Sequence, residues 1–237
     1  PPQPARSAQQ EMTGEPDDLC LNVWTPSMDP AARLPVMLWI PGGAYIRVDA
    51  SEPWYDGSAF ARDGVVLVSI NYRVGAHGFL ALPDAPNNRA LLDQIAALQW
   101  VRENIARFGG DASRVTVFGQ SAGASSVAAL LGAPAAQGLF AQAALQSPAQ
   151  GFISLAQSAR VTAAFAKALN VAPTREAFAN IDIKTLIDTS SQLDRAASDV
   201  KVWGEMAFTK ILQPIVDGVL MKRPPAAQLA GGASRNV

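Results

Sequence analysis

The motif Gly-Gln-Ser-Ala-Gly at residues 119–123 constrains the fold of this chain more than any other feature. Residues 115–118, Val-Thr-Val-Phe, are typical of a β-strand, and the small-residue run 122–131 favours a helix. A turn this tight leaves no room for side chains at its two glycines. The motif therefore predicts a strand–turn–helix unit at the edge of a sheet, with Ser121 held in a strained conformation.

Ser121 has the sequence surroundings of a catalytic nucleophile. The helix that begins at Ala122 directs free N–H groups and the positive end of its dipole towards the hydroxyl, which favours developing negative charge. Gly119, Gln120 and Gly123 are expected to support the turn. The alternative interpretation is a serine that only caps a helix between two glycines.

A second glycine-containing turn follows the apolar run 35–40 and is a candidate oxyanion hole. A serine nucleophile needs backbone N–H donors that approach the substrate carbonyl closely, and glycines permit that approach. We expect the donors to be the N–H groups of Gly43, Ala44 and Ala122, with Gly42 supporting the loop. An ordinary Gly-Gly turn is the alternative.

Apolar runs alternate with a helical pattern along the first 150 residues. Strands are expected at residues 19–24, 35–40, 64–70, 115–118 and 141–145, and a helix at 91–108. The run 64–70 is apolar on both faces, as an interior strand of a covered sheet must be. This alternation predicts an α/β sheet with helices on its faces. The short connection between the first two strands favours an antiparallel pair.

The charge balance gives no reason to expect a nucleic-acid partner or an anionic membrane surface. Lys and Arg number 19 and Asp and Glu number 20, for a net charge of −1. No apolar run is long enough to span a bilayer. The sequence contains neither a cluster of metal ligands nor a dinucleotide-binding loop, so we expect no metal and no organic cofactor.

Three further residues carry expectations about packing. Cys20, the only cysteine, is expected to be a small buried apolar side chain. Arg73 follows a core strand and Asp93 lies at the start of the core helix, so we expect these two charges to form a buried ion pair.

Four segments of the sequence resemble the type-B carboxylesterases, the carboxylesterase and cholinesterase family, and in particular its bacterial para-nitrobenzyl-esterase-like members. Residues 108–123 are similar to the family's active-site signature and residues 17–24 to its second signature. Residues 71–75 (Asn-Tyr-Arg-Val-Gly) and 91–94 (Leu-Leu-Asp-Gln) match in order and spacing.

The resemblance implies an α/β-hydrolase fold with a mostly parallel sheet, cut at both ends. As one partial domain, 1–237 would comprise a loop (1–18), the sheet core with the nucleophile elbow (19–148), a helical region (149–213) and a connection towards a missing C-terminal half (214–237). In this fold the triad order is nucleophile, acid, histidine. His77, the only histidine, precedes Ser121 and is expected to be structural, so the triad acid and histidine would lie beyond Val237.

The function implied is hydrolysis of small-molecule carboxylic esters through an acyl-enzyme on Ser121. The alternatives are a non-catalytic adhesion or scaffold member of the fold family, and an amidase or carbamate hydrolase that uses the same serine. The compartment and the oligomeric state stay open, because the sequence carries no signal for either.

The sequence departs from the family pattern at several positions. Gln120 replaces the usual Glu, Pro41 replaces the usual His, and Ala44 replaces a glycine. Cys20 lies two residues beyond the family's disulfide cysteine, whose position holds Asp18. An uncharged Gln120 predicts a preference for neutral esters over cationic ones.

Overall fold

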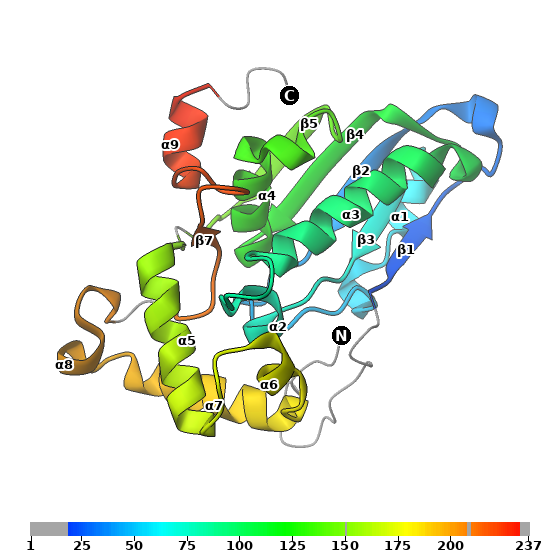
Figure 1. Ribbon diagram of the computed structural model, residues 1–237. Helices are drawn as coiled ribbons and strands as arrows, with labels where there is room; N and C mark the ends of the chain where they lie inside the picture. The colour runs from blue at the N-terminus through cyan, green and yellow to red at the C-terminus, as the bar shows by residue number, and fades with distance from the viewer. Residues whose placement is uncertain (1–18, 150, 208–209, 233–237) are drawn as a thin grey trace.

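The central sheet is built mostly from parallel strands. The computed structural model describes residues 19–149, 151–207 and 210–232. Among them, five strands form one sheet in the order β1-β3-β2-β4-β5 (Figure 1). The strands are β1 (Leu21–Trp24), β2 (Leu34–Ile40), β3 (Val66–Ile70), β4 (Gly110–Gln120) and β5 (Gln142–Gln146). The pairs β2–β3, β2–β4 and β4–β5 are all parallel.

Strand β1 lies at one edge of the sheet and pairs antiparallel with β3, with Leu21 opposite Ile70 and Trp24 opposite Leu67. The expectation that the first two strands pair with each other is therefore wrong. Both edges of β2 are occupied by parallel partners, β3 and β4, so the connection from β1 passes across a strand instead of forming a hairpin.

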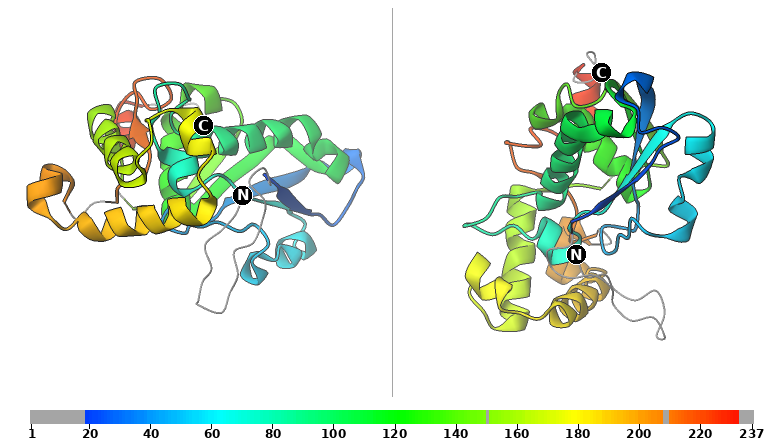
Figure 2. Two further views of the ribbon diagram at one scale, coloured as in Figure 1. Left: turned by 60° about the horizontal axis from the view of Figure 1, so that its bottom comes forward. Right: turned by 90° about the vertical axis from the view of Figure 1, so that its right-hand side faces the viewer.

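Helices lie on both faces of this sheet. Helices α3 (Arg89–Asn104) and α4 (Ala122–Gly132) cover one face, and α1 (Ser58–Arg62) lies on the other (Figure 2). On the α1 side, the ring of Trp39 is 4.8 Å from that of Phe118, which also contacts Phe60 of α1. The alternate residues of β2 are fully buried because they point towards the other face; they are Val36, Leu38 and Ile40.

The segment after β5 is mainly helical: residues 155–203 lie beyond the carboxyl ends of the central strands, and the last helix packs beside α4 (Figure 1). Its helices are α5 (Leu155–Leu169), α6 (Arg175–Ala179), α7 (Ile183–Ala196), α8 (Val200–Trp203) and α9 (Pro225–Ala230). The sequence predicts no strand between residues 152 and 213, but β6 (Ile153–Ser154) pairs in parallel with β7 (Ile215–Val216). A two-residue strand is too short to leave a period-2 pattern.

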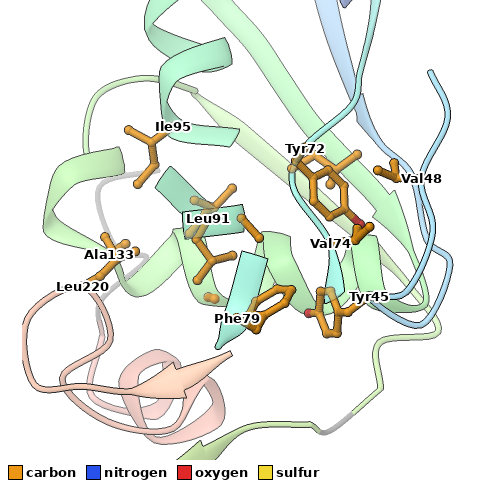
Figure 3. Close-up of a cluster of buried hydrophobic side chains, with 14 of the residues drawn as sticks. Tyr45, Val48, Tyr72, Val74, Phe79, Leu91, Ile95, Ala133 and Leu220 are labelled. Carbon is orange, nitrogen blue, oxygen red and sulfur yellow. The ribbon is translucent and has the colours of Figure 1, made fainter. Parts of the chain in front are cut away.

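Aromatic side chains pack the turn after β2 against the short helix α2 (Gly75–Phe79). The rings of Tyr45 and Phe79 are 4.8 Å apart, and Tyr72 is fully buried nearby (Figure 3). The Tyr72 hydroxyl donates a hydrogen bond of 2.7 Å to the carbonyl of Pro41. Burial raises the pKa of Tyr72, so the hydroxyl remains a donor at neutral pH.

The expected ion pair between Arg73 and Asp93 is present, whereas the expected burial of Cys20 is not. Arg73 and Asp93 form the predicted ion pair, with an NH2–Oδ1 distance of 2.5 Å. The side chain of Asp93 is 5% exposed and that of Arg73 is 34% exposed, so the carboxylate is buried and the guanidinium reaches partly into solvent. The expectation for Cys20 is wrong, because the residue is exposed in the segment that leads into the edge strand β1.

No helix of the described residues combines the length and the apolar character needed to cross a membrane.

Candidate active site

Ser121 occupies the single residue between the end of β4 and the start of α4. Its φ is 54° and its ψ is −120°, a conformation that a non-glycine residue adopts only when its surroundings impose it. Its backbone N–H donates to the carbonyl of Gln146, at the end of β5, over 3.0 Å. The turn is thus tied to the neighbouring strand, and Ser121 lies at the carboxyl edge of the parallel sheet.

The packing of the turn explains why both flanking residues are glycines. A Cβ on Gly119 would lie 2.6 Å from the carbonyl carbon of Gly123 and 2.8 Å from the carbonyl oxygen of Ile40. A Cβ on Gly123 would overlap that same Ile40 oxygen. Strand β2 therefore presses directly against the turn, and only glycine fits at either position.

The loop after β2 lies against the nucleophile turn. A Cβ on Gly42 would be 3.4 Å from Cβ of Ser121 and 2.7 Å from the carbonyl oxygen of Gln120. Gly43 has a φ of 123°, and the next two residues, Ala44 and Tyr45, also have positive φ values of 54° and 61°. Three consecutive residues in this region of backbone space make the loop an unusual, imposed conformation.

Hydrogen bonds fix this loop from both sides. The backbone N–H of Ile46 donates to the carbonyl of Gly43 over 3.0 Å. The N–H of Gly75, the first residue of α2, donates to the carbonyl of Tyr45 over 2.7 Å. Together with the bond from Tyr72 to Pro41, these contacts hold the loop before any ligand arrives, as preorganised N–H donors require.

Ala122 is the first residue of α4, so its N–H belongs to the turn of the helix that has no intrahelical acceptor. The positive end of the α4 dipole lies at the same point. The structure therefore brings Ala122 to the nucleophile turn directly, and brings the loop of Gly42, Gly43 and Ala44 beside it.

Gln120, immediately before the nucleophile, has an exposed side chain. Its Oε1 would lie 3.1 Å from a Cβ placed on Gly42, so the amide faces the loop after β2. An uncharged amide therefore lies beside the loop of the candidate oxyanion hole.

A buried polar cluster beneath the nucleophile was not anticipated from the sequence. The Ser125 hydroxyl lies 3.1 Å from the carbonyl oxygen of Ser121 and 2.5 Å from that of Ala149, and it can donate to either. Ser126, one residue further on, accepts a bond of 3.2 Å from Nε2 of Gln94. The sequence signal that could have indicated this cluster is the pair of adjacent serines, Ser125 and Ser126, on an otherwise apolar helix.

Tyr45, from the loop after β2, lies next to this cluster. Burial raises the pKa of Tyr45, and the neighbouring hydroxyls of Ser126 and Ser125 partly offset that effect. The buried phenol therefore stays protonated, and its hydroxyl lies beside the two serines without a hydrogen-bond partner of normal geometry among the described residues.

His77 lies on α2, where its carbonyl accepts a bond of 2.7 Å from Nε of Arg89. Burial lowers the pKa of His77, and the positive charges of Arg89 and Arg73 lower it further. Within the described residues no hydrogen bond joins its ring to Ser121. The same residues contain no group of three His, Cys, Asp or Glu side chains that could hold a metal ion.

Comparison with known proteins gives consistent matches. A model of the "Carboxylesterase family" matches residues 1–237. The para-nitrobenzyl esterase of Bacillus subtilis (strain 168) is 41% identical over 227 residues, which cover 93% of this chain and 45% of that protein. The fumonisin B1 esterase of Sphingopyxis macrogoltabida is 38% identical over 231 residues, covering 93% of this chain and 41% of that protein.

Solved structures agree in fold. A PNB esterase superposes with a TM-score of 0.84 at 38% identity, covering 98% of this chain and 49% of that one. A thermophilic PNB esterase gives a TM-score of 0.86 at 37% identity, covering 99% and 50%. The chain thus has an α/β-hydrolase fold and spans about half the length of the relatives that it matches.

Proposed function

Because this chain belongs to the carboxylesterase family, we propose that the whole protein hydrolyses carboxylic esters through a serine acyl-enzyme. The observation that carries the proposal is the strained turn at Ser121 with the loop of residues 42–44 packed against it. A helix cap would need neither the positive φ at Ser121 nor a second strained loop beside it.

In the proposed reaction, the Ser121 hydroxyl oxygen attacks the ester carbonyl carbon. Negative charge then develops on the carbonyl oxygen, and the N–H groups of Gly43, Ala44 and Ala122 donate to it. Collapse of the tetrahedral species releases the alcohol and leaves an acyl group on Ser121. Water attacks this ester in turn and releases the carboxylic acid.

The reaction needs a base that takes the proton of Ser121 and returns it to the leaving alcohol. We assign this base, and the acid that orients it, to parts of the whole protein outside the described residues. The reason is the location of His77, which lies on α2 and has its pKa lowered by burial and by two arginines. A histidine whose pKa is lowered by burial and then by positive neighbours is a weak base for the proton of Ser121.

Ester substrates are favoured over amides because both named relatives are esterases. The test compares p-nitrophenyl acetate with its amide analogue p-nitroacetanilide, using the whole protein and its Ser121→Ala variant. We expect hydrolysis of the ester to exceed that of the amide, and kcat on the ester to fall about 10⁴-fold or more in Ser121→Ala.

Two outcomes would contradict the proposal. An absence of ester hydrolysis in the whole protein would favour the scaffold alternative, and a faster rate on the amide would favour an amidase. Ser198→Ala serves as the matched control, because it removes an exposed hydroxyl just after α7, away from Ser121, and should leave the rate unchanged.

A further inference from the structure

A cavity of about 270 Å³ lies between α2, the start of α3, α6 and α7, away from the nucleophile turn. Figure 1 shows α6 and α7 beside α2 at this end of the molecule. The cavity is lined by three arginines, which are Arg73, Arg89 and Arg175. His77 lines the same cavity. Neither Ser121 nor the loop of residues 42–44 lines it.

Arg89 is the most deeply placed of the three, with 9% of the residue exposed. Its guanidinium donates to the carbonyl oxygens of four residues, at distances of 2.7 to 3.0 Å: Ala76, His77, Leu80 and Pro86. These bonds use four of its five N–H groups and none of the acceptors carries a formal charge. Burial lowers the pKa of Arg89 to about 10, which leaves it protonated at neutral pH.

The carboxylates near the cavity are already engaged. Asp93 is paired with Arg73. Asp84 accepts two bonds of 2.9 and 3.0 Å from the backbone N–H of Arg175 rather than from its side chain. None of the described residues that line the cavity is acidic, so its wall carries an excess of positive charge.

The positive charges that line the cavity also act on one another and on His77. The charges of Arg89 and Arg73 both contribute to the lowered pKa of His77, after burial. The pKa of Arg89 is lowered by Arg73 more than it is raised by Asp93. The remaining wall is apolar, with Leu80, Phe178 and Leu186, which strengthens electrostatic interactions inside it.

We propose that this cavity binds a small oxyanion, whose oxygens accept hydrogen bonds from the guanidinium groups of Arg89 and Arg175. Arg89 donates its one remaining N–H, and the guanidinium fork of Arg175 supplies paired donors that match the geometry of carboxylate or phosphate oxygens. The volume suits inorganic phosphate or a short dicarboxylate, whose methylene groups would contact the apolar part of the wall. The site is independent of the ester chemistry proposed for Ser121.

The test uses His77 as the reporter. It is the only histidine of residues 1–237, and in the whole protein its ring resonances are identified as those that disappear in the variant His77→Gln. Phosphate and succinate are titrated separately against chloride at matched ionic strength, because screening alone also changes the pKa values of exposed groups. We expect one of the two anions to bind saturably and to raise the pKa of His77, and the tighter ligand identifies the source of the oxyanion.

Variants locate the binding site. Arg175 is exposed, so Arg175→Gln should fold normally and weaken anion binding about tenfold. Arg33→Gln is the matched control, because Arg33 is 72% exposed and pairs with Asp111 at the far end of the sheet. Saturable binding that is weakened in Arg175→Gln and retained in Arg33→Gln supports the site. Absence of saturable binding by both anions, or equal affinity in all three proteins, would overturn it.

Discussion

At the scale of single residues, the candidate site depends on positions where only one side chain fits. Ser121 and Ala44 both have φ values of 54°, which cost energy for residues with a Cβ. Gly119 and Gly123 have no room for a Cβ. The surrounding sheet therefore holds Ser121 in its strained conformation. Gly119 and Gly123 make this possible, because they allow β2 to pack closely against the turn.

The packing around Gly123 gives a stability prediction. Gly123→Ala places a methyl group against the Ile40 carbonyl, and relief requires that β2 and α4 separate. We expect the free energy of unfolding to fall by about 3 kcal/mol, measured by urea denaturation. Gly231→Ala is the control, because its Cβ would meet its nearest atom at 3.3 Å and its φ is −76°. An unchanged stability in Gly123→Ala would mean that the turn is not packed as described.

The charge at position 120 gives a prediction about substrates and pH. Gln120→Glu introduces a carboxylate beside the loop of the candidate oxyanion hole, where it would stabilise the protonated form of the catalytic base. In the whole protein we expect the pKa in the acidic limb of the kcat/KM profile to rise. We also expect kcat/KM for a cationic ester to increase several-fold relative to a neutral one.

Gln142→Glu is the matched control for net charge, because Gln142 lies at the start of β5, away from the turn at Ser121. If Gln120→Glu and Gln142→Glu behave alike in both pH profile and charge preference, position 120 does not act on the site.

At the scale of elements, the sequence predicted features formed by consecutive residues better than features formed by segments that lie far apart in the chain. The turn at Ser121 was predictable because strand, turn and helix are consecutive. The ion pair between Arg73 and Asp93 was predictable because each charge interrupts an apolar run and needs a partner. The partner of β1 was not, because strand order depends on contacts between distant segments that leave no local pattern.

The pair of Arg73 and Asp93 connects the segment after β3 to α3, and its loss should loosen that connection. Asp93→Asn removes a charge that also accepts the backbone N–H of Arg73 over 3.0 Å. We expect the free energy of unfolding to fall by about 3 kcal/mol, at the lower end for a buried pair because Arg73 reaches partly into solvent. Lys184→Gln, which breaks an exposed pair with Asp188 on α7, should leave stability within error. Equal effects of the two variants in urea would contradict this account.

At the scale of the whole molecule, the chain forms a mostly parallel sheet covered by helices, with a further helical segment beyond the carboxyl ends of the central strands. The sequence predicted the fold class, and the motifs of residues 41–44 and 119–123 each follow a buried strand. The catalytic roles assigned to these residues stay predictions. The sequence did not predict the cavity lined by Arg89 and Arg175, because these residues meet only when α6 and α7 pack beside α2. The chain spans about half the length of the relatives that it matches.

The most direct measurement of the central claim is covalent labelling of the nucleophile. A fluorophosphonate probe reacts with an activated serine, which displaces fluoride and forms a stable phosphonate ester. In the whole protein, peptide mass spectrometry should find the label on Ser121, and Ser121→Ala should abolish it. Labelling that survives Ser121→Ala, or that maps to another serine, would show that Ser121 is not the nucleophile.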